Sequence, residues 1–163
     1  MVAAGGFSLV LTSQGTVYSW GLNNSGQCGI NEGNSFIIPT KISFFEDNLS
    51  ESETVTQIAA GGFHSLALTS KGEVYSCGEN KNGQCGLGIK TEIIMTPTKI
   101  SYLDDLLGEN DTIIQLIAGY FNSFYLTEHG DVYSWGMNIK GQCGLGTNEE
   151  KIKKPTKIST FDD

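Results

Sequence analysis

Hydrophobic and polar residues alternate in short stretches along most of the chain. Within residues 65–69, Leu66 and Leu68 stand two positions apart, the spacing that places side chains on one face of a β-strand. A turn containing Gly72 follows, and the alternation resumes at Val74. Because one position of a tight hairpin turn needs a positive φ, which glycine adopts at little cost, we predict a β-hairpin here.

Two further strands complete this pattern in the middle of the chain. Residues 58–60 form a short apolar run before the hairpin, and residues 97–100 form another run after it. We place Pro97 at the start of the last strand, where its missing N–H does least harm. No stretch has the apolar spacing of a long amphipathic helix, and the best helical candidate is the short segment 104–107.

The whole arrangement occurs three times. The third strand reads VYSW, VYSC and VYSW, and each unit ends in PTKIS. Four short antiparallel strands per unit, repeated in tandem, are typical of β-propeller blades. We therefore predict an all-β fold, a partial β-propeller of three blades, each a four-stranded antiparallel sheet, in one domain over 1–163. The units are expected at approximately 1–54, 55–112 and 113–163.

A second motif, GQCG, follows the third strand in every unit, starting at Gly26, Gly83 and Gly141. The stretch AGGFHSLALTSKGEVYSCGENKNGQCGLG, together with PTKI, resembles the regulator of chromosome condensation repeat. That repeat typically reads A-G-x-x-H-S-x-A-L, then G-x-V-Y-x-W-G, then G-Q-L-G-x-G and P-x-x-I. The resemblance covers nearly the whole chain and implies a β-propeller, which in this family usually has seven blades.

Residues at the repeating positions are expected to shape the blades rather than to perform chemistry. Cys28, Cys85 and Cys143 stand where the family usually has Leu, so we interpret each as a small apolar plug. Cys77 replaces the usual Trp, which we expect to loosen packing in the second unit. The full set of structural repeat positions is Trp20, Gly26, Cys28, Gly29, His64, Cys77, Gly83, Cys85, Gly86, Trp135, Gly141, Cys143 and Gly144.

The first unit is one residue shorter than the second, GGFSL against GGFHSL. The family's histidine is thus read as deleted in the first unit, present as His64 in the second, and replaced by Asn122 in the third. The resemblance implies that this histidine is a structural hydrogen-bonding residue near the inner end of the blade.

Three blades are fewer than the roughly four to eight that usually close a propeller. The first unit begins within its first strand, and the last unit ends within a junction, so the chain is expected to be a fragment of a larger propeller. Two alternatives stay open. A second copy would close a ring of six blades, or the chain is a small arc that is completed by another protein or stable alone.

The net charge limits the kinds of partner that the chain is expected to bind, and the amino-terminal sequence bears on its location. The net charge is −8, from 18 acidic and 10 basic residues, which disfavours direct binding to nucleic acid. An acidic surface suits a basic protein partner, or it serves solubility alone. The amino terminus has neither a basic flank nor a long apolar stretch, so we expect neither a secretory signal nor a membrane span, and no membrane partner. We therefore expect an intracellular, reducing location, cytoplasmic or nuclear.

No constellation of catalytic or ligand-binding residues stands apart from the repeat. The four cysteines lack a C-x-x-C pair, so zinc is not expected. Cys77 and Cys85 share a unit, but a reducing compartment disfavours a disulfide between them. The GQCGLG segments match no phosphate-binding loop, and 104–112 lacks the alternating ligands of a calcium loop. His129 lies in a hairpin turn, and Ser8, Ser65 and Ser123 recur by unit. We predict no cofactor, no metal and no enzymatic activity.

Partner binding is instead expected on the segments that differ between units, namely 31–38, 44–53, 90–95, 104–111 and 148–154. Two junctions between units are acidic, and we take them as the candidate partner-binding surface, with plain solvated loops as the alternative. Their acidic residues are Glu46, Asp47, Glu51 and Glu53 in the first junction, and Asp104, Asp105, Glu109 and Asp111 in the second.

These features favour a non-catalytic protein–protein interaction scaffold. The alternative that the resemblance implies is guanine-nucleotide exchange on a Ran-like small GTPase, the activity of the founding family member. The chain shows no inserted hairpin of the kind that such exchange would need. Ultraviolet-B sensing, which also occurs in the family, depends on G-W-R-H-T runs. Residues 61–65 read GGFHS, so we exclude that role.

Overall fold

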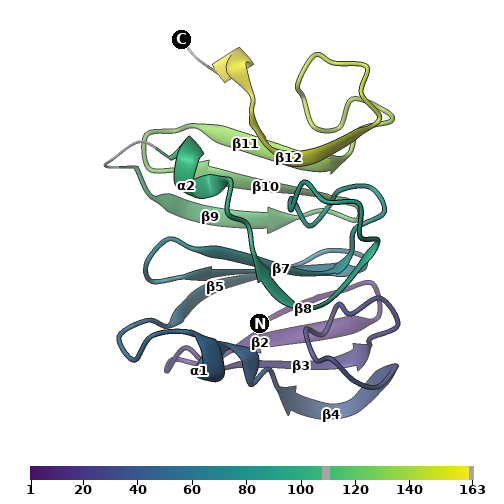
Figure 1. Cartoon of the computed structure of the whole chain (residues 1–163), viewed down its shortest axis with the longest axis vertical. Helices are drawn as coiled ribbons and strands as arrows, with labels where there is room; N and C mark the ends of the chain where they lie inside the picture. Colours follow the sequence, from purple (N-terminus) through teal and green to yellow (C-terminus); the bar gives the residue numbers. More distant parts are fainter. Residues whose placement is uncertain (108–110, 162–163) are drawn as a thin grey trace.

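The computed structural model describes residues 1–107 and 111–161, which fold into three four-stranded sheets (Figure 1). The first sheet contains β1 (Val2–Ala4), β2 (Phe7–Leu11), β3 (Val17–Leu22) and β4 (Ser35–Lys41). The second contains β5 (Val55–Ala60), β6 (His64–Thr69), β7 (Val74–Glu79) and β8 (Ile93–Lys99). The third contains β9 (Ile113–Ala118), β10 (Asn122–Thr127), β11 (Val132–Met137) and β12 (Lys151–Lys157).

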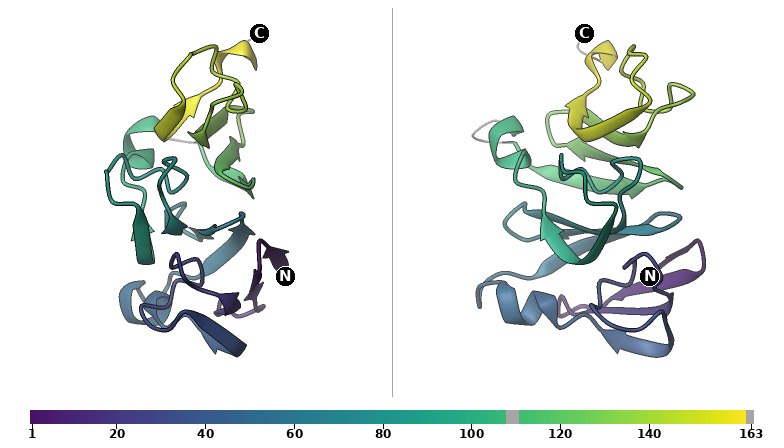
Figure 2. Two further views of the ribbon diagram at one scale, coloured as in Figure 1. Left: turned by 90° about the vertical axis from the view of Figure 1, so that its right-hand side faces the viewer. Right: turned by 45° about the vertical axis from the view of Figure 1, so that its right-hand side comes forward.

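Every sheet is an antiparallel meander in which consecutive strands are neighbours. The sheets lie side by side in chain order, and neighbouring sheets touch through their first and second strands (Figure 2). The predicted all-β fold of three propeller blades is therefore confirmed. The only helices in the described ranges are α1 (Phe44–Asn48), α2 (Leu103–Leu106) and the 3-10 turn η1 (Ser159–Phe161). None of them is long enough to span a membrane.

The burial of the strands follows from the order of the sheets. In the outer sheets the second strand alternates, with Phe7 and Leu9 of β2 buried and their neighbours half-buried. In the central sheet every residue of β6 is buried. A blade that is covered on both faces buries both rows of side chains, whereas an end blade buries one row.

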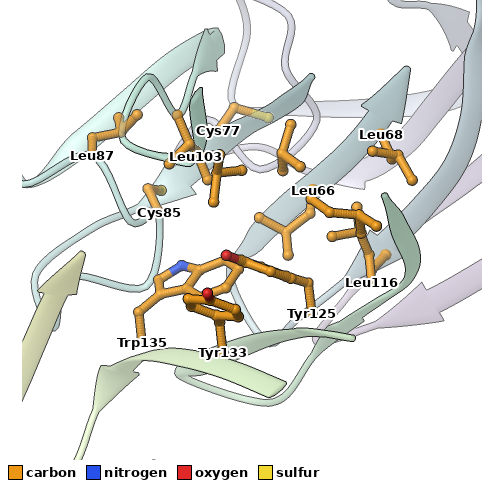
Figure 3. Close-up of a cluster of buried hydrophobic side chains, with 14 of the residues drawn as sticks. Leu66, Leu68, Cys77, Cys85, Leu87, Leu103, Leu116, Tyr125, Tyr133 and Trp135 are labelled. Atoms are coloured by element: carbon orange, nitrogen blue, oxygen red, sulfur yellow. The ribbon is translucent and has the colours of Figure 1, made fainter. Parts of the chain in front are cut away.

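Two apolar clusters form where the blades meet. The first cluster joins sheets one and two through residues such as Phe7, Leu9 and Tyr75. The second joins sheets two and three, where Trp135 and Tyr125 lie against Leu66 (Figure 3). The core therefore lies between the blades, in two layers.

The outer strand of the second blade differs from the prediction. β8 begins at Ile93, so placing Pro97 at the strand start was wrong. The pairing with β7 shifts between Ser76–Thr98 and Gly78–Ile94, which leaves extra residues in β8 between the two pairs. Pro97 lies in this irregular part of an outer strand, where its missing N–H breaks no ladder. The predicted helical segment 104–107 is α2, shifted by one residue.

The position of the missing histidine also differs from the prediction. Phe7 pairs with Gly21 as His64 pairs with Gly78 and Asn122 with Gly136. Phe7 therefore occupies the histidine position, and the turn before it has the same length as in the second blade, because Ala3 pairs with Ser8 as Ala60 pairs with Ser65. The reading of a deleted histidine was wrong, because the strands keep the same register and Phe7 replaces the histidine.

Candidate functional site: the blade seams and the junction face

Asparagine and serine side chains hold the GQCG loop of every blade. In the second blade, Cys85 N donates to Asn80 Oδ1 at 3.2 Å, and Ser76 Oγ donates to the Cys85 carbonyl at 2.8 Å. The other blades repeat these bonds through Asn23 and Ser19, and through Asn138 and Ser134. The sequence analysis did not single out these asparagines and serines. Their recurrence at the same position in each unit would have identified them.

The loop cysteines are fully buried. Cys28, Cys85 and Cys143 are each 0% exposed, and each Sγ lies 3.4 Å from a carbonyl oxygen of its own blade. Burial raises the pKa of the Cys28 thiol to about 11, so it stays neutral. All four cysteines are free thiols. This placement supports a packing role for the three loop cysteines.

A polar network joins the second blade to the third. The Gln84 carbonyl accepts hydrogen bonds from Ser123 Oγ at 3.0 Å and from Trp135 Nε1 at 2.8 Å. His64 Nε2 lies 2.8 Å from Ser123 Oγ. Because the Ser123 hydroxyl proton goes to Gln84, the histidine is the donor to Ser123. Burial lowers the pKa of His64 from 6.5 to about 4, which keeps the ring neutral.

The seam between the first and second blades has the same plan with fewer bonds. The Gln27 carbonyl accepts from Ser65 Oγ at 2.6 Å, while Cys77 Sγ lies 4.0 Å away from it. Phe7 takes the place of the histidine and offers no polar atom. A cavity of about 20 Å³ lies here, lined in part by Cys77, Leu66 and Pro97.

Glycines of the same loops touch the next blade directly. A Cβ at Gly83 would lie 2.9 Å from the Ile152 carbonyl oxygen, and one at Gly26 would lie 2.6 Å from the Ile94 carbonyl oxygen. Both glycines also have positive φ. Gly141, the equivalent residue of the third blade, has nothing within 4 Å of a Cβ position. Gly26 and Gly83 therefore allow close contact between neighbouring blades. The loop at Gly141 contacts no further blade among the described residues.

The junctions and the β2–β3, β6–β7 and β10–β11 hairpin turns lie at one end of the strands, on the left in Figure 1. The GQCG loops lie at the other end. We call the first end the junction face, formed by residues 12–16, 43–54, 69–73, 101–107, 111–112 and 127–131. Lys71 is the one basic residue in these segments besides His129, whereas acidic residues occur in most of them.

The predicted acidic residues of the junctions differ in their surroundings. In the first junction Glu46, Asp47 and Glu51 are exposed, and Glu46 forms an ion pair with Lys41. Glu53 is buried, with an oxygen 3.3 Å from Lys71 Nζ. These three exposed carboxylates are the part of the first junction that a partner can reach.

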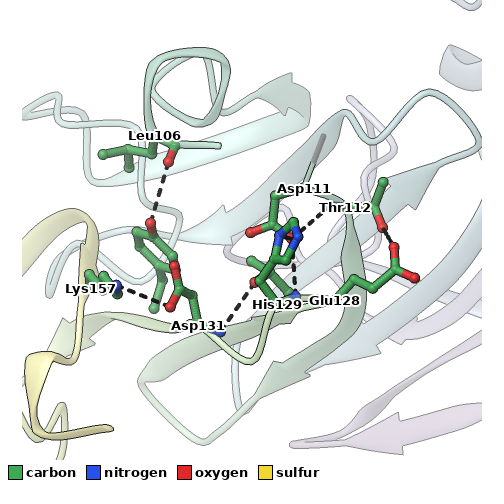
Figure 4. Close-up of polar contacts among 9 residues, drawn as sticks. Leu106, Asp111, Thr112, Glu128, His129, Asp131 and Lys157 are labelled. Carbon is green, nitrogen blue, oxygen red and sulfur yellow. Dashed lines mark hydrogen bonds and ion pairs between the residues drawn. The ribbon is translucent and has the colours of Figure 1, made fainter. Parts of the chain in front are cut away.

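In the second junction, Asp111 is engaged within its own blade (Figure 4). Its Oδ1 lies 3.0 Å from His129 Nδ1 and accepts hydrogen bonds from the backbone N–H groups of Thr112 and His129. Asp104 and Asp105 lie on α2, and Glu109 lies outside the described residues. The carboxylate of Asp111 is thus bound to the hairpin turn at His129. It is less available to a partner at the junction face than the sequence alone indicates.

The family model of the regulator of chromosome condensation (RCC1) repeat matches residues 14–68, 71–126 and 129–163. The chain belongs to the RCC1 repeat family. Each of the first two RCC1 matches begins in a hairpin turn of one blade and ends in the second strand of the next. The unit that the family repeats therefore contains a seam, which agrees with the recurrence of seam residues described above.

Relatives in this family are much longer than the chain. Human probable E3 ubiquitin-protein ligase HERC6 is 34% identical over 155 residues, which are 95% of this chain and 14% of HERC6. The RCC2 homolog of Danio rerio is 33% identical, over 93% of this chain and 28% of the relative. Yeast RCC1 (Prp20), solved bound to Kap60, has a TM-score of 0.79 at 27% identity, over 98% of this chain and 36% of Prp20.

Proposed function

We propose that the chain is a non-catalytic protein–protein interaction scaffold and an arc of a larger RCC1-type propeller. The repeating side chains are engaged in the loops and seams, so they build the rigid frame. Segments that differ between units, such as α1 and its neighbours, are displayed on that frame. The named activity of HERC6 belongs to a protein of which this chain spans 14%, so it is not carried over.

The observation that carries the proposal is the charge of the junction face. Asp47 and Glu51 are exposed, and neither forms an ion pair within the described residues. Carboxylates held on a rigid frame and free of lysine partners favour a basic protein surface. Yeast Prp20 is described with its binding to Gsp1p and histones, which supports protein partners, including basic ones, for a frame of this kind.

Binding to core histones tests the proposal. The triple variant Glu46→Gln, Asp47→Asn, Glu51→Gln removes the exposed charge of the first junction without touching a buried residue. We expect its affinity to fall about tenfold at low salt, with a weaker salt dependence than the unaltered chain. The triple variant Glu32→Gln, Glu149→Gln, Glu150→Gln, in loops at the opposite end of the strands, is the matched control, because it also removes three exposed charges. Equal affinities for both variants would remove the junction face from the proposal.

A second candidate function is guanine-nucleotide exchange on a Ran-like GTPase. The similarity to yeast RCC1 and the described binding of that protein to Gsp1p favour it. The measurement is release of a fluorescent GDP analogue from the GTPase. Acceleration by this chain would support exchange, and no acceleration at micromolar protein would exclude exchange by these three blades alone.

A further inference from the structure

A pocket of about 250 Å³ lies at the junction face, where the first blade meets the second. Its walls come from the β2–β3 turn at residues 14–17, from α1, and from the junction segment 49–55. The turn packs directly on the junction, since a Cβ at Gly15 would lie 2.7 Å from Thr54 Cβ. All lining residues fall within 14–55, so the pocket belongs to the seam between two described blades.

The pocket combines an apolar floor with an acidic mouth. Val17 and Phe45 line it and are buried, and Leu49 lies beside them half-buried. Glu46 and Glu51 also line the pocket, and both side chains are exposed. A ligand that suits both parts has an apolar stem and a positive head. The side chains of lysine and arginine have this form.

Glu53 adds a buried carboxylate to the lining. The residue is 9% exposed, and its Oε1 accepts no hydrogen bond from any described residue. Lys71 Nζ lies 3.3 Å from the other oxygen, Oε2, and donates a shorter hydrogen bond, at 2.7 Å, to Ser50 Oγ. A buried carboxylate oxygen without a donor costs free energy, which a donor entering the pocket would recover.

The equivalent carboxylate of the second junction is fully engaged. Glu53 and Asp111 are equivalent, because the residue after each accepts a backbone hydrogen bond from the hairpin turn of its blade. Asp111 Oδ1 accepts from two backbone N–H groups and lies 3.0 Å from His129 Nδ1. The repeat can therefore satisfy a carboxylate here by itself. The unused oxygen of Glu53 is a property of the first junction alone and points to a ligand from outside.

We propose that this pocket binds one lysine or arginine side chain of a basic protein partner. The stem packs on Phe45 and Leu49, and the head donates to Glu53 Oε1 while Glu51 lies at the mouth. The terminal torsion of a glutamate is soft, so the carboxylate can turn this oxygen toward the head while Lys71 stays at the other. This inference rests on the proposed function and names the contact that its partner makes.

The size of the pocket agrees with this occupant. Pockets for drug-sized ligands measure roughly 300–1,000 Å³, so a volume of about 250 Å³ suits a single side chain. A flat protein surface reaches only the exposed carboxylates of the junction, whereas one inserted side chain also reaches Glu53. A charged pair that is shielded from water is screened little by salt.

Two variants test the pocket with core histones as the probe. Glu53→Gln removes the buried charge and keeps the shape of the side chain, whereas Leu49→Trp fills the pocket and leaves every carboxylate in place. We expect each variant to lower the affinity at least about tenfold. Asp111→Asn is the matched control, because it removes the equivalent carboxylate outside the pocket and should leave the affinity unchanged. Far-UV circular dichroism establishes that each variant is folded.

Salt separates the pocket from the exposed carboxylates around it. The loss of affinity in Glu53→Gln should persist at high salt, whereas the loss in the triple variant Glu46→Gln, Asp47→Asn, Glu51→Gln should shrink. If the triple variant weakens histone binding while Glu53→Gln and Leu49→Trp bind as the unaltered chain does, the pocket is overturned and the scaffold function stands.

A small probe makes the test independent of histones. N-acetyl-arginine methylamide carries the stem and the head, and N-acetyl-citrulline methylamide is its neutral counterpart. At millimolar concentration the arginine probe should shift the backbone amide NMR signals of residues 14–17 and 49–55 in the unaltered chain, but not in Leu49→Trp. The citrulline probe should shift none. Absence of these shifts would overturn the pocket even where histones bind, whereas shifts without histone binding would support the pocket and overturn the proposed function.

Discussion

The two seams join blades of the same repeat with different chemistry. Between the second and third blades, Trp135 and Ser123 share the Gln84 carbonyl, and His64 extends the network. Between the first and second blades, Cys77 and Phe7 replace the tryptophan and the histidine, and a cavity of about 20 Å³ lies beside Cys77. The constant elements are the serine bond to a Gln carbonyl and the glycine contact with the outer strand. These two contacts are therefore sufficient for a seam. The indole of Trp135 and the imidazole of His64 add further stability to the second seam.

Giving the second seam the cysteine of the first seam should cause the largest loss of stability among these predictions. Trp135→Cys removes a fully buried indole and the bond to Gln84, so we expect the free energy of unfolding to fall by about 4 kcal/mol. Trp20→Cys, at the same position of the first blade, removes a half-buried indole without that bond and should cost about 1 kcal/mol. Urea unfolding followed by far-UV circular dichroism measures both. Similar losses for the two variants would mean that Trp135 gains little from its seam.

Disturbing the glycine contact should have the next largest effect on stability. Gly83→Ala forces a Cβ to 2.9 Å from the Ile152 carbonyl oxygen and also strains a residue with φ of 80°. We expect a loss of about 3 kcal/mol. Gly141→Ala imposes a similar φ strain, at 73°, with no neighbour, and should cost about 1 kcal/mol. The difference between the two unfolding free energies isolates the seam, and equal values would show that backbone strain alone explains the recurrent glycines.

Acid should weaken the second seam through His64. The pKa of this ring is lowered by burial to about 4, against 6.5 when the residue is unfolded, so the unfolded chain binds the extra proton between these values. The penalty is absent above pH 6.5, grows as the pH falls, and is complete near pH 4. At pH 5 it amounts to about 2 kcal/mol.

The check is the slope of unfolding free energy against pH. His64→Phe, which copies the residue of the first blade, should remove this contribution between pH 6.5 and 4. A slope that persists unchanged in His64→Phe would assign the acid sensitivity to other groups.

The sheets were predictable because each blade pairs only within itself. Alternation in residues 65–69 and a turn glycine predict a local hairpin. Because the pattern occurs three times, the same prediction applies to the other two units. The seams were not predictable, because the bond from Ser65 to Gln27 joins residues far apart in the chain. Glu53 and Glu51 look alike in the sequence, yet only the folded chain shows that Glu53 is buried beside Lys71. The helix α1 has five residues, too few for a periodic pattern.

Filling the cavity of the first seam should have the smallest effect and the opposite sign. Cys77 is buried in a strand, burial raises the pKa of its thiol to about 12, and its Sγ makes no short hydrogen bond. Cys77→Val adds one methyl-sized group beside the cavity and suits a strand, so we expect a gain of about 0.5 kcal/mol. The same substitution at Cys85, whose Sγ lies 3.4 Å from a carbonyl in a filled site, should instead destabilise by about 1 kcal/mol. Opposite signs at these two cysteines would show that the first seam is underpacked, whereas a loss at both would mean that its packing is already as complete as the thiol allows.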